Sequence, residues 1–339
     1  MTRVLVTGAS GFIGRHVAEA AVRRGYEVVA LVRNISTYQA PRPSVFPAAG
    51  DVRDPESVRS ALKGCDAFIH LAALYTFDST QTEVMREVNV DGTQNVLRMA
   101  LKVGVERIVY TGTVGGTAFS IDGLATERDL AGPETMKGPY KRSKFEAERV
   151  VRQMAMQGAP VVTVCPTAPI GPGDEKPTPT GRIVRDFMRR RMPAYVDTGL
   201  NFVHVRDVAE GHLLALERGQ LGARYLLGNA DGNLTLSQAF GILSELTGVS
   251  APRLRLPHTA VLAAARVSEI AGRILRRPPA IALEAAQMAS TRMWVDPSWS
   301  VRELRMPQTP VRQAFQEAVE WFAAHGETAG NKPRDSVDA

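Results

Sequence analysis

A tyrosine and a lysine stand four residues apart in the segment PYKRSK, residues 139–144. On a helix, Tyr140 and Lys144 would lie on one face, close enough to interact. A free tyrosine has a pKa of about 10, and a neighbouring ammonium group favours the phenolate and so lowers that pKa. The spacing therefore predicts a phenol that gives or takes a proton near neutral pH while a hydride moves at a carbonyl carbon.

A hydroxyl group that could hold the substrate oxygen stands upstream, at Thr113, just after a strand expected over Arg107–Thr111. Thr113 would donate a hydrogen bond to the alkoxide that develops when hydride reaches a carbonyl group. A tyrosine and a lysine at this spacing are common in proteins, so the interpretation needs a second motif.

That second motif is glycine-rich and lies near the N-terminus, where TGASGFIG (residues 7–14) follows an expected strand over Val4–Thr7 and opens an expected helix over residues 11–24. Glycines allow a tight turn and a close approach of the backbone to a pyrophosphate. The start of the helix then offers free N–H groups to the phosphates. The alternative is an ordinary strand–helix turn. We expect a dinucleotide to bind here, at Gly8, Gly11, Phe12, Ile13 and Gly14.

The second expected strand, Glu27–Val32, predicts which dinucleotide binds. A carboxylate about 20 residues after the glycine turn would bind the ribose 2′-hydroxyl of NAD. Arg33 stands at that place instead, and a guanidinium suits a 2′-phosphate. We therefore expect NADP(H) rather than NAD(H), the alternative being that Arg33 points into solvent.

Strand-like and helix-like segments alternate through the first 165 residues, which predicts a parallel sheet covered by helices on both faces. A proline-rich turn is expected at Pro41, Pro43 and Pro47, and Asp54 is expected to cap a short helix that begins at Pro55. The other expected strands are 67–71 and 161–165, and the other expected helices are 82–102 and 139–157.

The pattern changes after Pro166, where proline and glycine concentrate in a long expected loop, residues 166–181. Further helices follow, with short strands expected at 194–196, 202–205 and 225–227. We expect a dinucleotide-binding domain over 1–165, to which 203–230 returns. A substrate lobe is expected over 166–202 and 231–326, and a flexible tail over 327–339.

The motifs together resemble those of extended short-chain dehydrogenases/reductases, and more closely the hopanoid-associated sugar epimerase family, which is itself similar to dihydroflavonol 4-reductases. This resemblance implies an α/β fold, a Rossmann-type doubly wound parallel sheet with a smaller, mostly helical C-terminal substrate lobe. It runs to about residue 326 and rests on TGASGFIG, GDVRD (50–54), HLAA (70–73), NVDGT (89–93), YKRSKFEAE (140–148), CPTAPIGP (165–172), GDEKPTPTGRIV (173–184) and FVHVRD (202–207).

The resemblance also implies a set of cofactor contacts. Asp51 and Val52 would meet the adenine, and Lys144 would bond the hydroxyls of the nicotinamide ribose. Asn89 would hold a structural bend, the alternative being a part in catalysis. The remaining implied contacts lie toward the nicotinamide: Leu71, Ala72, Ala73 and Thr111, with Pro166 and Thr167 beside the carboxamide.

Two departures from the family pattern bear on the substrate. The family commonly has two serines where this chain has Gly112 and Thr113, and Thr113 keeps the hydroxyl. Nucleotide-sugar epimerases carry an arginine just before the F-x-H-V strand, where this chain has Leu200 followed by Asn201. The second departure weakens the case for a nucleotide-diphosphate sugar.

Composition limits the partners. The chain has 339 residues and a net charge of +6, and its densest basic cluster (Arg182, Arg185 and Arg189 to Arg191) accompanies no nucleic-acid motif, so no nucleic acid is expected. The two cysteines, Cys65 and Cys165, are too few for a disulfide framework, and neither a metal site nor a membrane-spanning segment is expected. We expect a cytoplasmic protein.

Two contacts with larger partners stay open. The apolar segment 259–275, followed by Arg276 and Arg277, is expected to be a core-packing helix, with a lid or a contact to the inner membrane face as the alternative. The expected helices 82–102 and 139–157 are candidates for a homodimer interface.

Three functions remain in view. The first is an NADP(H)-dependent oxidoreductase acting on a carbonyl or secondary alcohol of a small-molecule or lipid-linked polyol, hopanoid-linked in the context of the resemblance. The second is a sugar epimerase or dehydratase that retains its cofactor, and the third is a protein that binds NADP(H) without turnover.

Overall fold

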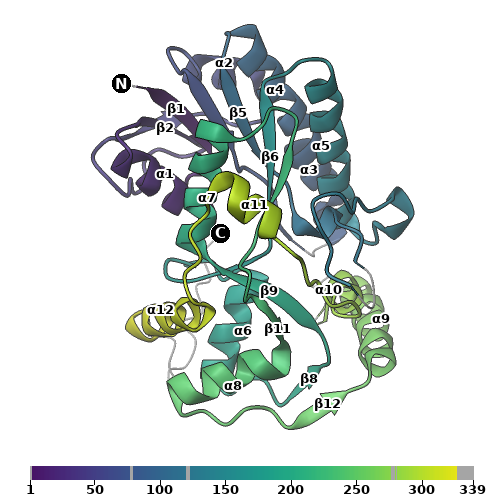
Figure 1. The fold of residues 1–339 in the computed structure, drawn as a ribbon. Helices are drawn as coiled ribbons and strands as arrows, with labels where there is room; N and C mark the ends of the chain where they lie inside the picture. Colours follow the sequence, from purple (N-terminus) through teal and green to yellow (C-terminus); the bar gives the residue numbers. More distant parts are fainter. Residues whose placement is uncertain (1, 77–78, 120–122, 276–278, 280, 327–339) are drawn as a thin grey trace.

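Seven strands form one parallel sheet at the centre of the computed structural model, which describes residues 2–76, 79–119, 123–275, 279 and 281–326 (Figure 1). Their spatial order is β10-β6-β5-β4-β1-β2-β3, and every neighbouring pair is parallel. The strands are β1 (Arg3–Thr7), β2 (Glu27–Val32), β3 (Val45–Ala49), β4 (Ala67–His70), β5 (Arg107–Thr111), β6 (Val161–Pro166) and β10 (Arg224–Leu227).

The order of these strands confirms the Rossmann-type, doubly wound sheet. From β1, the chain adds strands toward one edge of the sheet as far as β3 and then toward the other edge from β4 onward. Ligands of such folds bind in the crevice at this switch point between β1 and β4, outside the carboxyl ends of the strands. The glycine turn follows β1 directly, so it lies at that crevice. The strands inside the sheet are rich in Val, Ile and Ala and are buried on both faces, as parallel strands require, whereas the edge strand β3 is largely exposed.

Helices cover both faces of the sheet. On one face α1 (Phe12–Arg23) and α7 (Val205–Arg218) pack against the strands. Leu304, the last residue of α11 (Ser298–Leu304), and the nearby Met306 belong to the same apolar cluster. On the other face the apolar cluster draws on α2 (Pro55–Ala61), α4 (Gly92–Lys102) and α5 (Pro139–Met156). As predicted, Asp54 caps α2, because its side chain accepts the N–H of Glu56 at 3.1 Å and Pro55 begins the helix.

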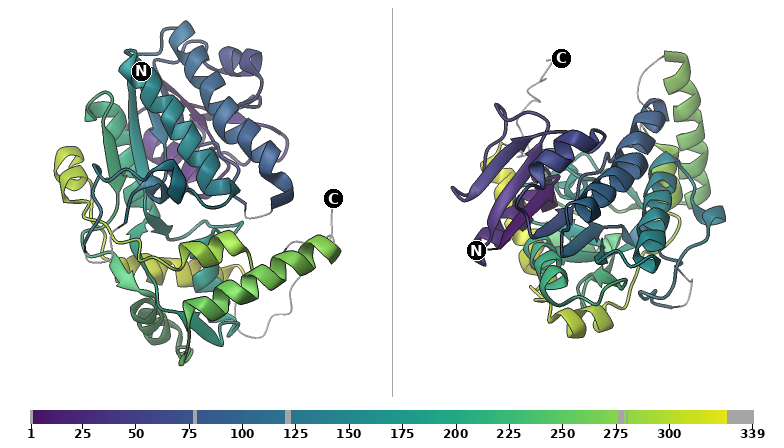
Figure 2. Two further views of the ribbon diagram at one scale, coloured as in Figure 1. Left: turned by 90° about the vertical axis from the view of Figure 1, so that its right-hand side faces the viewer. Right: turned by 90° about the horizontal axis from the view of Figure 1, so that it is seen from above.

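A smaller lobe lies beyond the carboxyl ends of the strands (Figures 1 and 2). Its core joins the sheet β11-β9-β7 to three helices, α6 (Pro179–Met188), α8 (Leu236–Thr247) and α12 (Val311–Ala324). The sheet strands are β7 (Ala168–Ile170), β9 (Gly199–His204) and β11 (Asn233–Thr235). Around this core lie the pair β8 (Ala194–Val196) and β12 (Leu254–Leu256), then α9 (His258–Leu275) and α10 (Leu283–Met288).

Proline placement corrects two expectations. Pro47, expected in a turn, lies inside β3 and pairs with Ala30. Since β3 is the edge strand of the sheet, its free side needs no N–H donor and tolerates proline. The expected loop 166–181 contains β7 and the start of α6, because Ala168–Ile170 pairs with the distant strand β9.

The expected long helix 82–102 is confirmed, but a π-helical turn, Glu87–Asp91, lies inside it between α3 (Thr82–Arg86) and α4. Asn89 lies in this turn, buried, and its amide bonds both the N–H (2.7 Å) and the carbonyl oxygen (3.0 Å) of Leu74. Its Nδ2 also donates to Ser143 Oγ at 3.0 Å. The structural role expected for Asn89 is confirmed, since it joins this helix to α5 and to the loop after β4.

Helix α9 is apolar but only partly packed. Ala265 is buried, whereas Val267 and Ile270 are 66% and 59% exposed. Among the described residues no helix combines the length and apolar character needed to cross a bilayer. The tail 327–339 and the arginines at 276 and 277 lie outside the described residues.

Candidate active site

The glycine turn is packed so closely that side chains cannot replace its hydrogens. A Cβ on Gly14 would lie 2.0 Å from the carbonyl oxygen of Gly8, and one on Gly8, whose φ is +72°, would lie 2.8 Å from the nitrogen of Ala72. Helix α1 begins at Phe12 with Gly11 as its N-cap, has no side-chain cap and carries no acidic residue in its first turn. The backbone N–H groups at this helix start therefore suit an anion such as a pyrophosphate.

A buried histidine holds the glycine turn against the end of β4. The Thr93 hydroxyl donates its one proton to the carbonyl oxygen of Asn89 (2.6 Å), so toward His70 Nε2 (3.1 Å) it can only accept. His70 Nδ1 is then the acceptor for the Thr7 hydroxyl at 2.7 Å. These contacts leave a single consistent tautomer, with the proton of His70 on Nε2.

The same network fixes the backbone beside the turn. Thr7 Oγ1 accepts the N–H groups of Leu71 and Ala72, both at 3.2 Å. Burial and, to a smaller extent, the charge of Lys144 lower the pKa of His70 to about 3. The imidazole therefore stays neutral at physiological pH, and the contact between β1 and β4 does not change with protonation.

Two arginines and one aspartate gather where the adenosine half of a dinucleotide is expected. Arg53 binds Asp51 through two hydrogen bonds, 3.0 and 2.8 Å long. The pKa of Asp51 is lowered chiefly by this bond to Arg53 and also by the charge of Arg33. Arg33 is exposed directly after β2, and Val52 is buried against the helices. Sequence reasoning missed Arg53, although it belongs to the GDVRD motif that contains Asp51.

Tyr140 lies in the first turn of α5, and the Thr113 side chain is near enough to its phenol to influence it. Thr113 Oγ1 accepts the N–H of Gly115 at 3.1 Å, which leaves its own proton free to donate. Tyr75, a residue that sequence reasoning missed, stacks on Tyr140 with ring centroids 4.1 Å apart. The structure thus brings the two predicted catalytic oxygens together and adds an aromatic ring over the phenol.

The sequence predicts a lowered pKa for the Tyr140 phenol, and this prediction is wrong. Burial raises the pKa of Tyr140 well above its ordinary value, the nearby Thr113 side chain lowers it by less, and the carboxylate of Glu284 raises it again. The Lys144 ammonium is directed at the carbonyl oxygen of Thr111, 2.8 Å away, and not at the phenol. Tyr140 therefore stays protonated near neutral pH, which suits a proton donor.

Lys144 is almost completely buried, at 5% exposure, with its Nζ 4.9 Å from the centre of the Tyr110 ring. Burial lowers the pKa of Lys144 to about 8, while the nearby Glu148 carboxylate raises it. The group is thus mainly an ammonium at neutral pH and has donors beyond the one used by Thr111.

A buried ion pair supports helix α5 and the loop that carries Thr113. Arg224 Nε on β10 lies 2.9 Å from Glu148 on α5, with both side chains under 10% exposed. Arg224 also donates to Thr117 Oγ1 (2.9 Å) and to the carbonyl oxygen of Thr113 (3.4 Å). One guanidinium therefore links the sheet edge, helix α5 and the loop that carries Thr113.

The two departures from the family pattern have structural counterparts. A Cβ on Gly112 would lie 2.9 Å from Cys165 Sγ and 3.0 Å from Glu148 Oε2, so there is no room for a serine. Leu200 packs into the apolar core of the smaller lobe. Asn201 is buried, donates to the carbonyl oxygen of Asn229 at 2.8 Å and accepts the N–H of that residue at 3.0 Å, so no guanidinium occupies this place.

The sequence-predicted site residues follow the carboxyl ends of the parallel strands, as the topology requires. The glycine turn follows β1, Arg33 follows β2, and residues 51 and 52 follow β3. The other members are Leu71, Ala72 and Ala73 after β4, Thr111 and Thr113 at and beyond the end of β5, and Pro166 and Thr167 at the end of β6.

Comparison with known proteins agrees with this geometry. Residues 4–228 match the profile of the NAD dependent epimerase/dehydratase family, a range that contains the glycine turn, Tyr140 and Lys144. A candidate dihydroflavonol 4-reductase of Synechocystis sp. is 40% identical and covers 95% of this chain and 94% of its own length. Sterol demethylase protein B of Methylococcus capsulatus is 34% identical over 95% of this chain and 98% of its own.

Among solved structures, the crystal structure of gox2253 is similar along nearly the whole chain. It has a TM-score of 0.85 at 38% identity, and the match covers 97% of this chain and 100% of that one. The likeness therefore includes the smaller lobe as well as the sheet.

The buried ion pair yields a stability prediction. Replacing Arg224 by Met leaves the Glu148 carboxylate buried without its partner, which should lower the free energy of unfolding by about 3–5 kcal/mol. Urea denaturation measures this change. In the control, Arg59→Met removes a solvent-exposed ion pair with Glu56 and should leave the free energy of unfolding almost unchanged. Equal effects of the two substitutions would contradict a supporting role for Arg224.

Proposed function

The chain belongs to the NAD dependent epimerase/dehydratase family, and on this premise we propose that it is an NADP(H)-dependent reductase that converts a carbonyl group into an alcohol. The observation that carries the proposal is that the Thr113 side chain lies near enough to the Tyr140 phenol to lower its pKa, with Lys144 one helical turn further along. This arrangement offers a proton and a second hydroxyl donor at the carboxyl edge of the sheet, beside the glycine turn.

The residues present fit a dinucleotide. The first turn of α1 has backbone N–H donors and no competing carboxylate, and glycines at positions 8 and 14 leave the backbone open to a diphosphate. Phe12 and Ile13 belong to this first turn. When bound, the nicotinamide supplies the hydride that adds to the carbonyl carbon.

Proton transfer is assigned to Tyr140. As hydride reaches the carbonyl carbon, the oxygen takes the phenol proton, and water then restores that proton to Tyr140. Thr113 holds the same oxygen with the proton that its contact to Gly115 leaves free. Lys144 serves as an anchor for the ribose hydroxyls and, through its positive charge, stabilises the phenolate that forms briefly.

NADP(H) is the cofactor that we propose, because of the charges after β2 and β3. Arg33 and Arg53 place two guanidinium groups around one carboxylate, Asp51. Arg53 already pairs with that carboxylate, whereas Arg33 is exposed and fits a 2′-phosphate.

The substrate that we propose carries a sugar- or polyol-like group on an apolar framework of hopanoid type. Leu200 and the fully bonded Asn201 supply no cation for a nucleotide diphosphate. The names of two relatives include a dihydroflavonol and a sterol, both polycyclic compounds, which supports an apolar framework here.

An epimerase that retains its cofactor is the second candidate, favoured by the family to which the chain belongs. The two reactions differ in the net change of nicotinamide absorbance. A reductase oxidises one NADPH for each carbonyl reduced, whereas an epimerase returns the hydride and leaves the absorbance unchanged at the end of the reaction.

Replacing Tyr140 by Phe tests the proton donor. The ring and its stacking on Tyr75 remain while the proton is lost, so turnover should fall by about 10²–10⁴-fold. NADPH oxidation with a panel of ketones, including dihydroquercetin as a dihydroflavonol, measures turnover, and fluorescence titration measures NADPH affinity, which should not change. Turnover at the wild-type rate would remove Tyr140 from the mechanism.

Replacing Arg33 by Gln tests the cofactor preference. Loss of a charge-assisted contact worth about 1.5–3 kcal/mol should weaken NADPH binding by about 10–100-fold and leave NADH binding unchanged. Calorimetric titration of both cofactors gives the two affinities. Arg59→Gln, an exposed change on α2, is the matched control. A wild-type protein that binds NADH as tightly as NADPH would contradict the assignment.

A further inference from the structure

Helix α5, which carries the proposed proton donor, has no capping residue of its own. Its N-cap is Gly138, which has no side chain and a φ of +94°, and Pro139 has no N–H to offer. Arg142 N–H already bonds the carbonyl oxygen of Gly138 at 3.2 Å. The N–H groups of Tyr140 and Lys141 are therefore the ones that need acceptors from outside the helix.

Both N–H groups are bound by one carboxylate from the other end of the chain. Glu284 Oε1 accepts from Lys141 N at 2.9 Å, and Glu284 Oε2 accepts from Tyr140 N at 3.3 Å. Glu284 is only 5% exposed. A negative charge at a helix N-terminus is stabilising, so the side chain serves as a cap supplied from 144 residues away.

The backbone before the helix is shaped to admit this carboxylate. A Cβ on Gly138 would lie 2.2 Å from the Cδ atom of Glu284, and the φ of Gly138 is one that other residues rarely adopt. Glycine at 138 and glutamate at 284 thus form a matched pair, which argues against an accidental contact.

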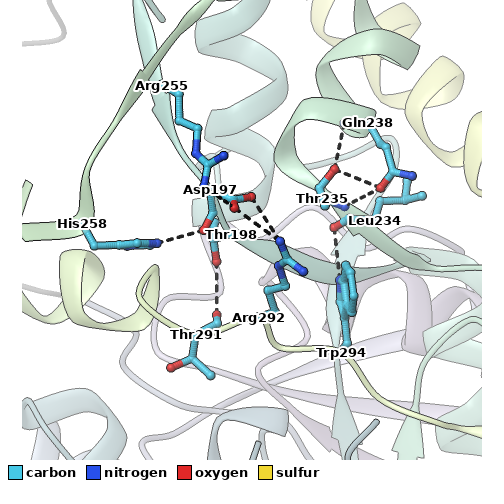
Figure 3. A network of polar contacts seen from close by, with 10 residues as sticks. All are labelled: Asp197, Thr198, Leu234, Thr235, Gln238, Arg255, His258, Thr291, Arg292 and Trp294. Atoms are coloured by element: carbon cyan, nitrogen blue, oxygen red, sulfur yellow. Dashed lines mark hydrogen bonds and ion pairs between the residues drawn. The ribbon is translucent and has the colours of Figure 1, made fainter. Parts of the chain in front are cut away.

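Glu284 is delivered by α10, and the chain after α10 is fastened to the smaller lobe (Figure 3). Thr198 Oγ1 donates to the carbonyl oxygen of Thr291 at 3.1 Å, and Asp197 pairs with Arg292 at 3.3 Å. Thr198 lies directly before β9, at the core of the smaller lobe. The Glu284 side chain therefore joins the smaller lobe to the first turn of α5.

The charged and titratable groups around the phenol come from several elements. Lys141 and Lys144 lie on its own helix, Tyr110 lies on β5, and Tyr75 stacks on the ring from the loop after β4. Glu284 on α10 is the carboxylate that acts on Tyr140 and raises its pKa.

Glu284 is itself influenced by its surroundings. Burial raises its pKa, the two N–H groups and the charge of Lys141 lower it, and Glu269 on α9 raises it. The cap is thus a buried charge held by directed hydrogen bonds, and its removal should lower the pKa of the Tyr140 phenol, on which it acts.

We propose that Glu284 is a positioning residue for Tyr140, through which the smaller lobe fixes the helix turn that carries the phenol. This inference rests on the proposed function, since it takes Tyr140 as the proton donor. Glu284 itself contacts backbone N–H groups and is not assigned a proton-transfer step.

The test is an ultraviolet titration of the phenolate with saturating NADP⁺, using Tyr140→Phe to identify the signal of Tyr140. Glu284→Gln keeps the volume and one acceptor oxygen but removes the charge, so the Tyr140 signal should appear at a pH lower by about one unit. Glu284→Asp keeps the charge and should restore the wild-type titration. Glu134→Gln removes an exposed carboxylate from the turn before α5 and should change nothing.

The outcomes separate this inference from the proposed function. Turnover of ketones by Tyr140→Phe at the wild-type rate overturns the proposed function. If Tyr140→Phe is inactive but Glu284→Gln titrates as the wild type does, the inference about Glu284 alone is wrong. If Glu284→Gln does not fold, Glu284→Asp decides, because a shift of its signal as large as about one pH unit would show that the charge does not set the titration.

Discussion

The ammonium group of Lys144 is buried, and the placement of α5 depends on the groups that compensate its charge. A buried charge without partners is costly, and here a carbonyl oxygen, an aromatic face and the Glu148 carboxylate surround it. Glu148 in turn is held by Arg224 from the sheet edge. This series of contacts places α5 across the end of β5 and so brings Tyr140 to Thr113.

A second constraint operates at the other end of the crevice. The hydroxyl of Thr7 and the neutral ring of His70 join the last residues of β1 and β4, where the strand order reverses. Because the glycine turn is packed against the backbone of Ala72, the dinucleotide site and the start of the loop after β4 are built as one unit. That loop carries Tyr75, which stacks on Tyr140.

The two lobes therefore meet at the phenol in different ways. The sheet supplies Thr113 through the loop after β5, while the smaller lobe supplies Glu284 to the N–H of Tyr140. A substrate held by the smaller lobe would be aligned with the proposed proton donor, whose helix turn is bound by Glu284 of the same lobe. Preorganisation of this kind is what a reaction with a developing alkoxide requires.

The sequence alone determined what depends on local pattern. The glycine turn, the strand–helix alternation and the four-residue spacing of Tyr140 and Lys144 each follow from neighbouring residues, so the sheet and the core of the candidate site were predictable. Tertiary structure decided what depends on distant partners: the strand at Pro47, the π-helical turn at Asn89 and the cap from Glu284. The raised pKa of Tyr140 belongs to the same group, because burial is a property of the packed chain and sequence spacing does not reveal it.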